Sequence, residues 1–293
     1  MLAVVVLAVL LQGCQDGSSV SIPSTASTSR SSGSLSPEEV ARQTGYSTSS
    51  DGLTPVYALV PEFRDPSDGY ARDLLAEKCL EGIVEYRAVE PVASEVFDER
   101  TGQGIFNSHV AEVWGYPHLR SWDTEDSAVP DSVVITDEIH AELVKCGEAA
   151  DRRLGWAPDD YLVEVEAAGW EAFNTSAEMR SVEDAWRLCM APSGVKDLPQ
   201  SPRGMPPESI VPGPSISGEG GLVGTVELTE EERQLAIFDA HCRESVGYDE
   251  TGLRVRANAE LSYIGKDLGL FEAARDEYEI YGLKIHEVLA EFD

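Results

Sequence analysis

The chain has 293 residues, of which 53 are acidic and 22 are lysine or arginine, so its formal net charge is −31. This charge excludes nucleic acid as a partner, because phosphate backbones are bound by basic stripes, and it disfavours a position flat on anionic lipid. We interpret the acidity as an aid to solubility, with a cationic partner or loosely held calcium as the alternative. The hydrophobic content of 42% is enough for a packed core in one large domain or two small ones.

The chain opens with an apolar run, MLAVVVLAVLLQGC, that stops at Cys14. A dozen apolar residues fall short of the roughly 20 that span a membrane, but this length is typical of a signal peptide. The run resembles a bacterial lipoprotein signal, because Leu11 and Gly13 precede Cys14 as in a lipobox, although Gln12 is a less usual residue there. We therefore predict a signal peptide over residues 1–13 and a lipid on Cys14, with ordinary secretion as the alternative. Because signals normally begin with Lys or Arg, we expect a few residues to precede this start.

Residues 14–52 are dominated by Ser, Thr and Gly, and their large apolar side chains are too few to offset the entropy of ordering them. We predict a lipidated, disordered tether whose root-mean-square reach is on the order of 30 Å. Order is expected to begin near Thr54.

Helical periodicity then indicates a mainly α protein. Thr136 and Thr229, each followed by acidic residues, mark helix starts, and Glu232 suits a capping box with Thr229. Residues 82–134 and 191–228, which proline and glycine interrupt repeatedly, are expected to be long irregular segments. Helices are expected over residues 70–81, 136–155, 158–173, 182–190 and 229–246.

A long amphipathic stripe closes the chain. Apolar residues recur about every 3.5 positions, which predicts one long C-terminal helix or a coiled-coil strand. We favour packing of this stripe on the protein's own core, and docking of a partner helix is the alternative. Its members are Ala257, Leu261, Ile264, Leu268, Phe271, Ala274, Tyr278, Tyr281, Ile285, Val288 and Phe292.

Four cysteines remain when the predicted lipidation site is set aside. An even number in an oxidising compartment predicts two disulfides, for which three connectivities are possible. The chain twice repeats one plan, in which a helix ending in cysteine leads to a glycine, a broken loop and a Thr-started acidic helix with a second cysteine. Pairing within each repeat joins Cys79 to Cys146 and Cys189 to Cys242. We therefore predict a disulfide-stapled ectodomain of two helical repeats.

The first repeat is placed at residues 53–156, and the second, with the long C-terminal helix, at residues 157–293. Their matching stretches are ARDLLAEKCLEG with ITDEIHAELVKC, and SVEDAWRLCMAPSG with LTEEERQLAIFDAHC.

Several of these features also carry a resemblance to a known group. They are a cysteine-methionine-glycine stretch after a helix, a loop ending in Gly-Tyr, and a Thr-started acidic helix that ends in cysteine. The residues concerned are Trp186, Cys189, Met190 and Gly194, then Gly104, Ile105, Trp114, Gly115 and Tyr116, and finally the run from Thr229 to Cys242. In this pattern the chain resembles a set of uncharacterised actinobacterial lipoproteins, although Cys79-Leu80 stands where Cys-Met is expected. The resemblance implies an architecture and an accessory role beside an export transporter, but no activity.

Motifs for metal or catalytic chemistry are missing from the sequence. The five histidines are scattered, with no HExxH or CxxC pattern, and no Gly-x-Ser-x-Gly nucleophile elbow occurs. Gly218-Glu219-Gly220-Gly221 lacks the preceding strand and the lysine of a phosphate loop, so we interpret it as a flexible turn. We predict no metal site, no cofactor and no catalytic residue.

Aromatic residues crowd one irregular segment, and exposed aromatics on loops commonly anchor peptides, glycans and protein partners. We take Trp114, Tyr116 and Trp122 as candidate binding residues, with a local core as the alternative.

The sequence thus predicts a non-enzymatic lipoprotein, anchored at the extracytoplasmic face of the cell membrane, that binds or assists an envelope protein or transporter. The alternative is an extracellular hydrolase acting on cell-wall glycan or peptide, whose carboxylates cannot be picked out among 53 acidic residues.

Overall fold

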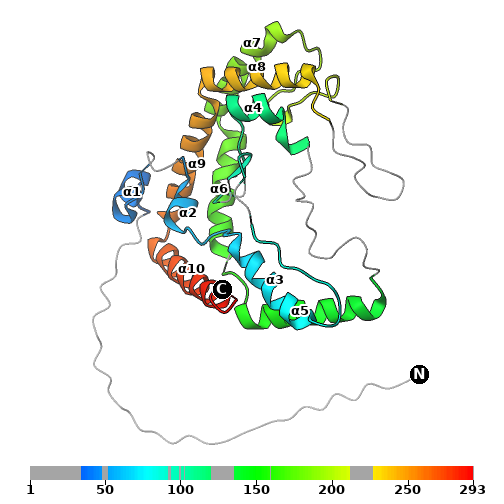
Figure 1. Cartoon of the computed structure of the whole chain (residues 1–293). Coiled ribbons are helices and arrows are strands. Elements are labelled where there is room, and N and C mark those ends of the chain that lie inside the picture. Colours follow the sequence, from blue (N-terminus) through cyan, green and yellow to red (C-terminus); the bar gives the residue numbers. More distant parts are fainter. Residues whose placement is uncertain are drawn as a thin grey trace, which may run out of the picture. The chain divides into compact units, whose positions relative to one another are not determined.

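The chain is described by a computed structural model, shown in Figure 1, which is mainly helical as the sequence predicts. The described residues are 34–47, 52–91, 94–98, 100–101, 103–119, 135–158, 160–211 and 227–292. The signal peptide, Cys14 and Trp122 lie outside these ranges.

The helices are α1 (Pro37–Thr44), α2 (Pro55–Leu59), α3 (Ser67–Leu80), α4 (Ser108–Trp114), α5 (Asp137–Leu154), α6 (Asp160–Thr175), α7 (Ala177–Met190), α8 (Glu230–Val246), α9 (Tyr248–Ile264) and α10 (Leu268–Leu289). Short 3-10 turns occupy η1 (Pro117–Leu119), η2 (Ala191–Ser193) and η3 (Pro202–Gly204). Strands β1 (Phe97–Asp98) and β2 (Gln103–Gly104) form a small antiparallel hairpin. No described helix is long and apolar enough to cross a membrane.

The predicted disordered tether over residues 14–52 is wrong near its end, because helix α1 lies within this range. The Ser36 hydroxyl accepts a hydrogen bond from the Glu39 amide at 3.3 Å, and Pro37 opens the first turn, so the helix start is well capped. Val40 is fully buried in the core. The polar composition therefore misled the prediction over residues 34–46, because one buried valine and a strong cap are enough to fix a short helix.

Two disulfides join helix pairs. Cys79 of α3 is bonded to Cys146 of α5, and Cys189 of α7 is bonded to Cys242 of α8. These are the pairs that the two-repeat plan predicts. In both repeats the second helix is capped by a threonine, whose hydroxyl accepts from the Ile139 amide in α5 and from the Glu232 amide in α8.

The C-terminal stripe is divided between two helices. Helix α9 ends at Ile264, and α10 begins after Asp267, whose carboxylate accepts from the Leu270 amide at 3.0 Å. The predicted single helix is therefore interrupted at residues 265–267. Packing of the stripe on the protein's own core is confirmed, since Phe271, Tyr278 and most other members are buried.

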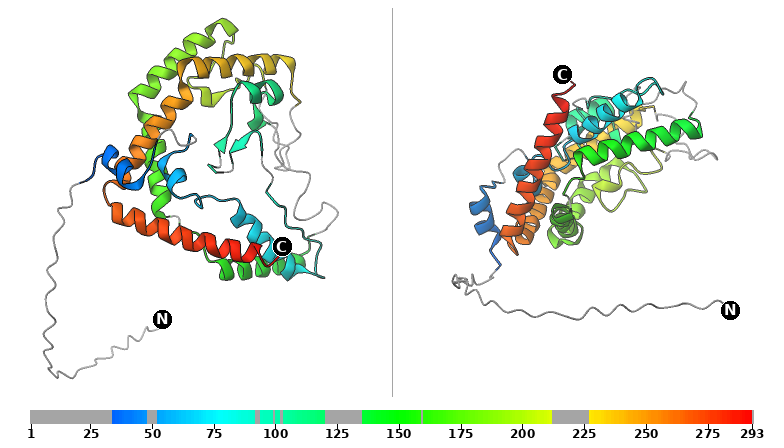
Figure 2. Two further views of the ribbon diagram at one scale, coloured as in Figure 1. Left: turned by 60° about the vertical axis from the view of Figure 1, so that its left-hand side comes forward. Right: turned by 90° about the horizontal axis from the view of Figure 1, so that it is seen from below.

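Two main cores hold the helices together. The first gathers apolar side chains of α1, α2, α6, α9 and α10, and the second those of α4, α7 and α8. Helices α3 and α5 pack together and against α10, the red helix in Figure 2. Contacts such as those between α4 and α8, or α3 and α10, cross the predicted boundary at residue 156. The two repeats therefore share one compact unit, Ser34–Asp293.

Helices α6 and α9 approach each other closely at two glycines that face bulky side chains. A Cβ on Gly169 of α6 would lie 2.7 Å from the Glu260 carboxylate, and a Cβ on Gly252 of α9 would lie 2.6 Å from the Phe173 ring. The absence of side chains at these two positions allows this pair of helices to form one side of the pocket described next.

Candidate functional site

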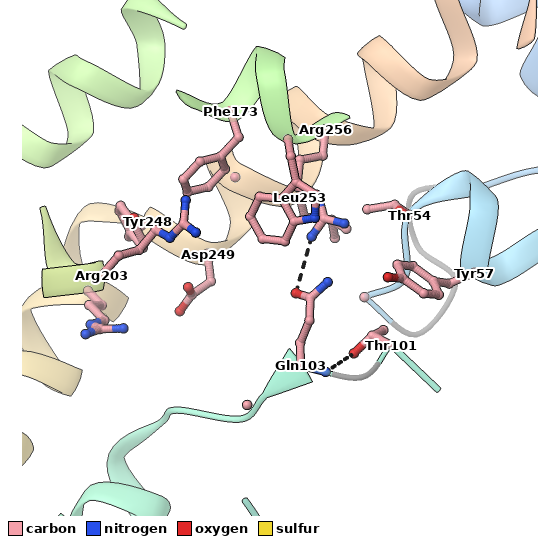
Figure 3. Close-up of a pocket in the computed structure, with 15 residues that line it drawn as sticks. Thr54, Tyr57, Thr101, Gln103, Phe173, Arg203, Tyr248, Asp249, Leu253 and Arg256 are labelled. Carbon is pink, nitrogen blue, oxygen red and sulfur yellow. Dashed lines mark hydrogen bonds between the residues drawn. The ribbon is translucent and has the colours of Figure 1, made fainter. Parts of the chain in front are cut away.

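A pocket of about 310 Å³ opens between α9, the end of α6, the β1–β2 hairpin and the loop that carries η3 (Figure 3). Three arginines line it, Arg203, Arg243 and Arg256, in a chain whose acidic residues outnumber its basic ones by 53 to 22. We call this site the arginine pocket. Its volume lies at the small end of the roughly 300–1,000 Å³ typical of ligand sites.

One face of α9 forms the floor of the arginine pocket. Asp249 lines it together with Gly252, Leu253 and Arg256, which lie three, four and seven residues further along the helix. The aromatic wall comes from Trp170 and Phe173 of α6, Tyr248 of α9 and Tyr57 of α2. A charged residue therefore stands at each end of the floor, with small and apolar residues between them.

Arg256 is the most enclosed cation of the pocket, with 6% of the residue exposed. Its guanidinium lies 3.8 Å from the centre of the Trp170 ring, a cation–π contact. Its Nη1 donates to Gln103 Oε1 at 3.3 Å, whereas Nε and Nη2 have no hydrogen-bond acceptor among the described residues. Burial lowers the pKa of this guanidinium, but an arginine stays charged. The site thus encloses a cation with unused donors.

Glu260 does little to satisfy the donors of Arg256 or to neutralise its charge. Its Oε1 lies 3.9 Å from Arg256 Nη2, beyond hydrogen-bond distance, and its Oε2 accepts from the Val56 amide at 3.1 Å. Burial of this carboxyl, which is fully inaccessible, raises its pKa to about 7. Near neutral pH a large fraction of Glu260 is therefore uncharged, so it balances the positive charge of Arg256 only in part.

Glu166, the next carboxylate on this side, is already bound within the fold. It accepts from the Tyr57 hydroxyl at 2.5 Å and from Arg64 Nη2 at 2.9 Å. Burial alone would raise the pKa of Glu166, but these two hydrogen bonds lower it below its ordinary value. Glu166 is thus an ionised partner of Arg64.

The other two arginines differ from Arg256. Arg243 forms a two-pronged pair with the fully buried Asp239, through bonds of 3.0 and 2.8 Å, so its charge is neutralised within the fold. Arg203 is exposed at the rim, donates to Asn174 at 2.9 Å and lies 5.1 Å from the centre of the Trp170 ring. Neither is as enclosed as Arg256.

Asp249 supplies the negative end of the pocket floor. It is exposed, and it makes no hydrogen bond or ion pair with the described residues. Surrounding protein atoms raise the pKa of this carboxyl, and Arg243 acts in the opposite direction. Figure 3 shows its carboxylate directed into the space between α9 and the hairpin.

Two of the aromatic residues singled out in the sequence, Trp114 and Tyr116, do not line the arginine pocket. Tyr116 is 1% exposed and stacks on Phe106 at 5.4 Å between ring centres, which favours the local-core alternative for this residue. Its amide donates to Glu232 at 3.0 Å, a long-range bond that the capping pattern does not predict. Trp114 is partly exposed at the end of α4 and does not line the arginine pocket.

The arginine pocket is not among the sites predicted from the sequence. One signal could have suggested it: Gly252 lies inside α9, where a glycine costs roughly 0.5–1 kcal/mol relative to alanine. A glycine at such a position indicates the close approach of another group. Asp249 and Arg256 flank this glycine on the same helical face.

Among the described residues, no three His, Cys, Asp or Glu side chains are grouped so as to hold a metal ion. Comparison of the chain with known protein families, with curated proteins and with solved structures finds no match.

Proposed function

We propose that this chain is a non-enzymatic binding protein of the cell envelope, which holds a small ligand with an anionic group in the arginine pocket. The observation that carries the proposal is Arg256, a nearly buried guanidinium with two N–H-bearing nitrogens that lack acceptors. Leaving buried charged donors unsatisfied is costly. A ligand oxygen in the pocket would offset part of that cost.

The arrangement of the carboxyls favours binding over hydrolysis. A hydrolase of glycans needs two carboxyl groups that reach the scissile bond. Glu260 has a pKa suited to acid–base chemistry, but it is fully buried and does not line the pocket. Glu166 is engaged by Tyr57 and Arg64. Neither glutamate is placed to meet a substrate.

We further propose that the protein is lipid-anchored through Cys14 at the extracytoplasmic face of the membrane and passes its ligand to, or assists, an envelope protein or transporter. The support is the apolar run that stops at this cysteine. Cys14→Ala should release the protein from membranes or stall its processing. Unchanged mass and membrane fractionation of this variant would refute the anchor.

Calorimetric titration of the full-length chain in detergent tests the binding function. The probes are acetate, benzoate, inorganic phosphate and the common amino acids. At least one should bind, and Arg256→Gln should weaken it about tenfold or more, because hydrogen bonds to charged groups contribute about 1.5–3 kcal/mol. Arg254→Gln, which changes an exposed arginine of the same helix, is the matched control and should bind normally. Failure of every probe to bind the wild-type chain would contradict the proposal.

A further inference from the structure

We infer that the arginine pocket takes a free amino acid with an apolar side chain, bound as a zwitterion with its carboxylate on Arg256 and its ammonium on Asp249. This inference rests on the proposed binding function and specifies the ligand. Its basis is the pairing of an enclosed cation that has unused donors with an accessible, unpaired carboxylate on one face of α9.

The spacing of the two charges suits such a ligand. Asp249 and Arg256 are seven residues apart, which corresponds to about 10.5 Å along a helix axis. Long helical side chains lean toward the N-terminus, so the guanidinium is brought closer to Asp249. One amino acid fills the remaining gap between the Arg256 guanidinium and the Asp249 carboxylate. Its own carboxylate and ammonium lie a short distance apart, and each adds a charge-assisted hydrogen bond of about 2.8 Å. A dianion would instead place a negative group against Asp249.

Gln103 occupies one donor of Arg256, Nη1, which lies beside the unused Nη2 on the same guanidinium. Its side-chain oxygen accepts from Arg256 Nη1 at a long 3.3 Å, as Figure 3 shows. A carboxylate would be a stronger acceptor than this neutral amide. Gln103 belongs to a hairpin with two-residue strands, and such a small hairpin has little stability of its own. The side chain can therefore yield to a ligand at small cost.

The rest of the pocket and the charge of the chain restrict the class of ligand further. Trp170, Phe173 and Leu253 offer apolar surface beside the charged ends of the floor. The net charge of −31 repels free anions at long range, whereas an amino acid with an apolar side chain has no net charge. These features favour amino acids such as leucine and phenylalanine over simple carboxylates or phosphate.

Ligand analogues test this inference on the unaltered full-length chain. Calorimetry should detect binding of L-leucine or L-phenylalanine. N-acetyl-L-leucine, which lacks the ammonium, and L-leucinamide, which lacks the carboxylate, should each bind at least about tenfold more weakly, in line with one charged hydrogen bond lost.

Two variants then assign the ends of the ligand. Asp249→Asn should weaken L-leucine about tenfold but leave N-acetyl-L-leucine unchanged, whereas Arg256→Gln should weaken both. Glu250→Gln is the matched control, because Glu250 is also an acid in the first turn of α9 but does not line the pocket. Circular dichroism and melting temperature establish that each variant is folded.

The outcomes separate the two proposals. Equal affinity for L-leucine and N-acetyl-L-leucine, or tight binding of benzoate or phosphate with none of leucine, would overturn the amino-acid inference and leave the binding function standing. Absence of binding by every probe would overturn both.

Discussion

At the scale of single residues, Glu260 links pH to stability. Its folded pKa of about 7 exceeds the ordinary value of 4.5, so the folded state holds this proton more tightly than the unfolded state does. Its contribution favours folding fully below about pH 4.5 and is lost as the pH rises through 7. The difference corresponds to about 3 kcal/mol.

Glu260→Gln should therefore make the protein more stable than the wild type above pH 7 and have little effect below pH 5. The glutamine is neutral at every pH and can still accept from the Val56 amide. Chemical unfolding at pH 5 and pH 8 measures the difference, and Glu171→Gln, an exposed change on α6, is the control. A variant that loses stability equally at both values would contradict the prediction. The groups that face Glu260 are Arg256 on its own helix, Glu166 of α6, Thr54 just before α2, Val56 of α2, and Tyr46 after α1.

Gly252 is a second residue with a defined role, because it leaves room for the Phe173 ring between α6 and α9. A Cβ there would lie 2.6 Å from Phe173 Cε2, so Gly252→Ala should push the ring out of place and weaken ligand binding. Gly147, within α5, has no atom within 4 Å of such a Cβ, so Gly147→Ala should stabilise the protein by roughly 0.5–1 kcal/mol. Melting curves and ligand titration of the two variants make the comparison. Similar behaviour of both would mean that the closeness of α6 and α9 does not matter to the pocket.

At the scale of elements, the sequence predicts which helices are present better than it predicts where they end. Thr136 and Thr229 marked their helices correctly, because a hydroxyl before an acidic turn is a local signal. The break between α9 and α10 was missed, since both helices pack on the same core and the apolar spacing continues across it. The arginine pocket was missed for another reason. Its walls come from segments more than 150 residues apart, such as Gln103 and Arg256, which no local pattern relates.

The stripe on α10 gives a stability prediction. Phe271 is fully buried in the first core, and cutting a core phenylalanine to alanine typically costs about 3–5 kcal/mol. Phe271→Ala should therefore lower the melting temperature strongly, while Leu283→Ala, on the same helix but 63% exposed, should change it little. Thermal unfolding followed by circular dichroism provides the measurement. An unmoved melting temperature for the Phe271 variant would contradict the core role of α10.

At the scale of the whole molecule, the charge and the fold act together. A chain with a net charge of −31 repels itself when compact, and each of its two main cores draws side chains from both repeats. Cross-links between helices offset this repulsion by restricting the unfolded chain. The bonded cysteines are 67 and 53 residues apart in sequence, so loop-closure entropy assigns about 4 kcal/mol to each disulfide.

The two disulfides should nevertheless differ in their effect on function. Replacing Cys79 and Cys146 with alanine removes a link between α3 and α5, neither of which lines the arginine pocket. Replacing Cys189 and Cys242 loosens α7 from α8, where Asp239 both accepts from Trp186 Nε1 at 2.8 Å and holds Arg243 in the pocket wall. Both double variants should melt at lower temperature than the wild type.

Ligand affinity should distinguish the two double variants. Titrated at a temperature where both remain folded, the Cys79/Cys146 variant should keep wild-type affinity for L-leucine. The Cys189/Cys242 variant should bind more weakly, because motion between α7 and α8 displaces Arg243 and the wall around it. Equal loss of affinity in both would mean that the disulfides act only through global stability. Equal retention would mean that the buried Trp186–Asp239–Arg243 contacts position this wall without the covalent link.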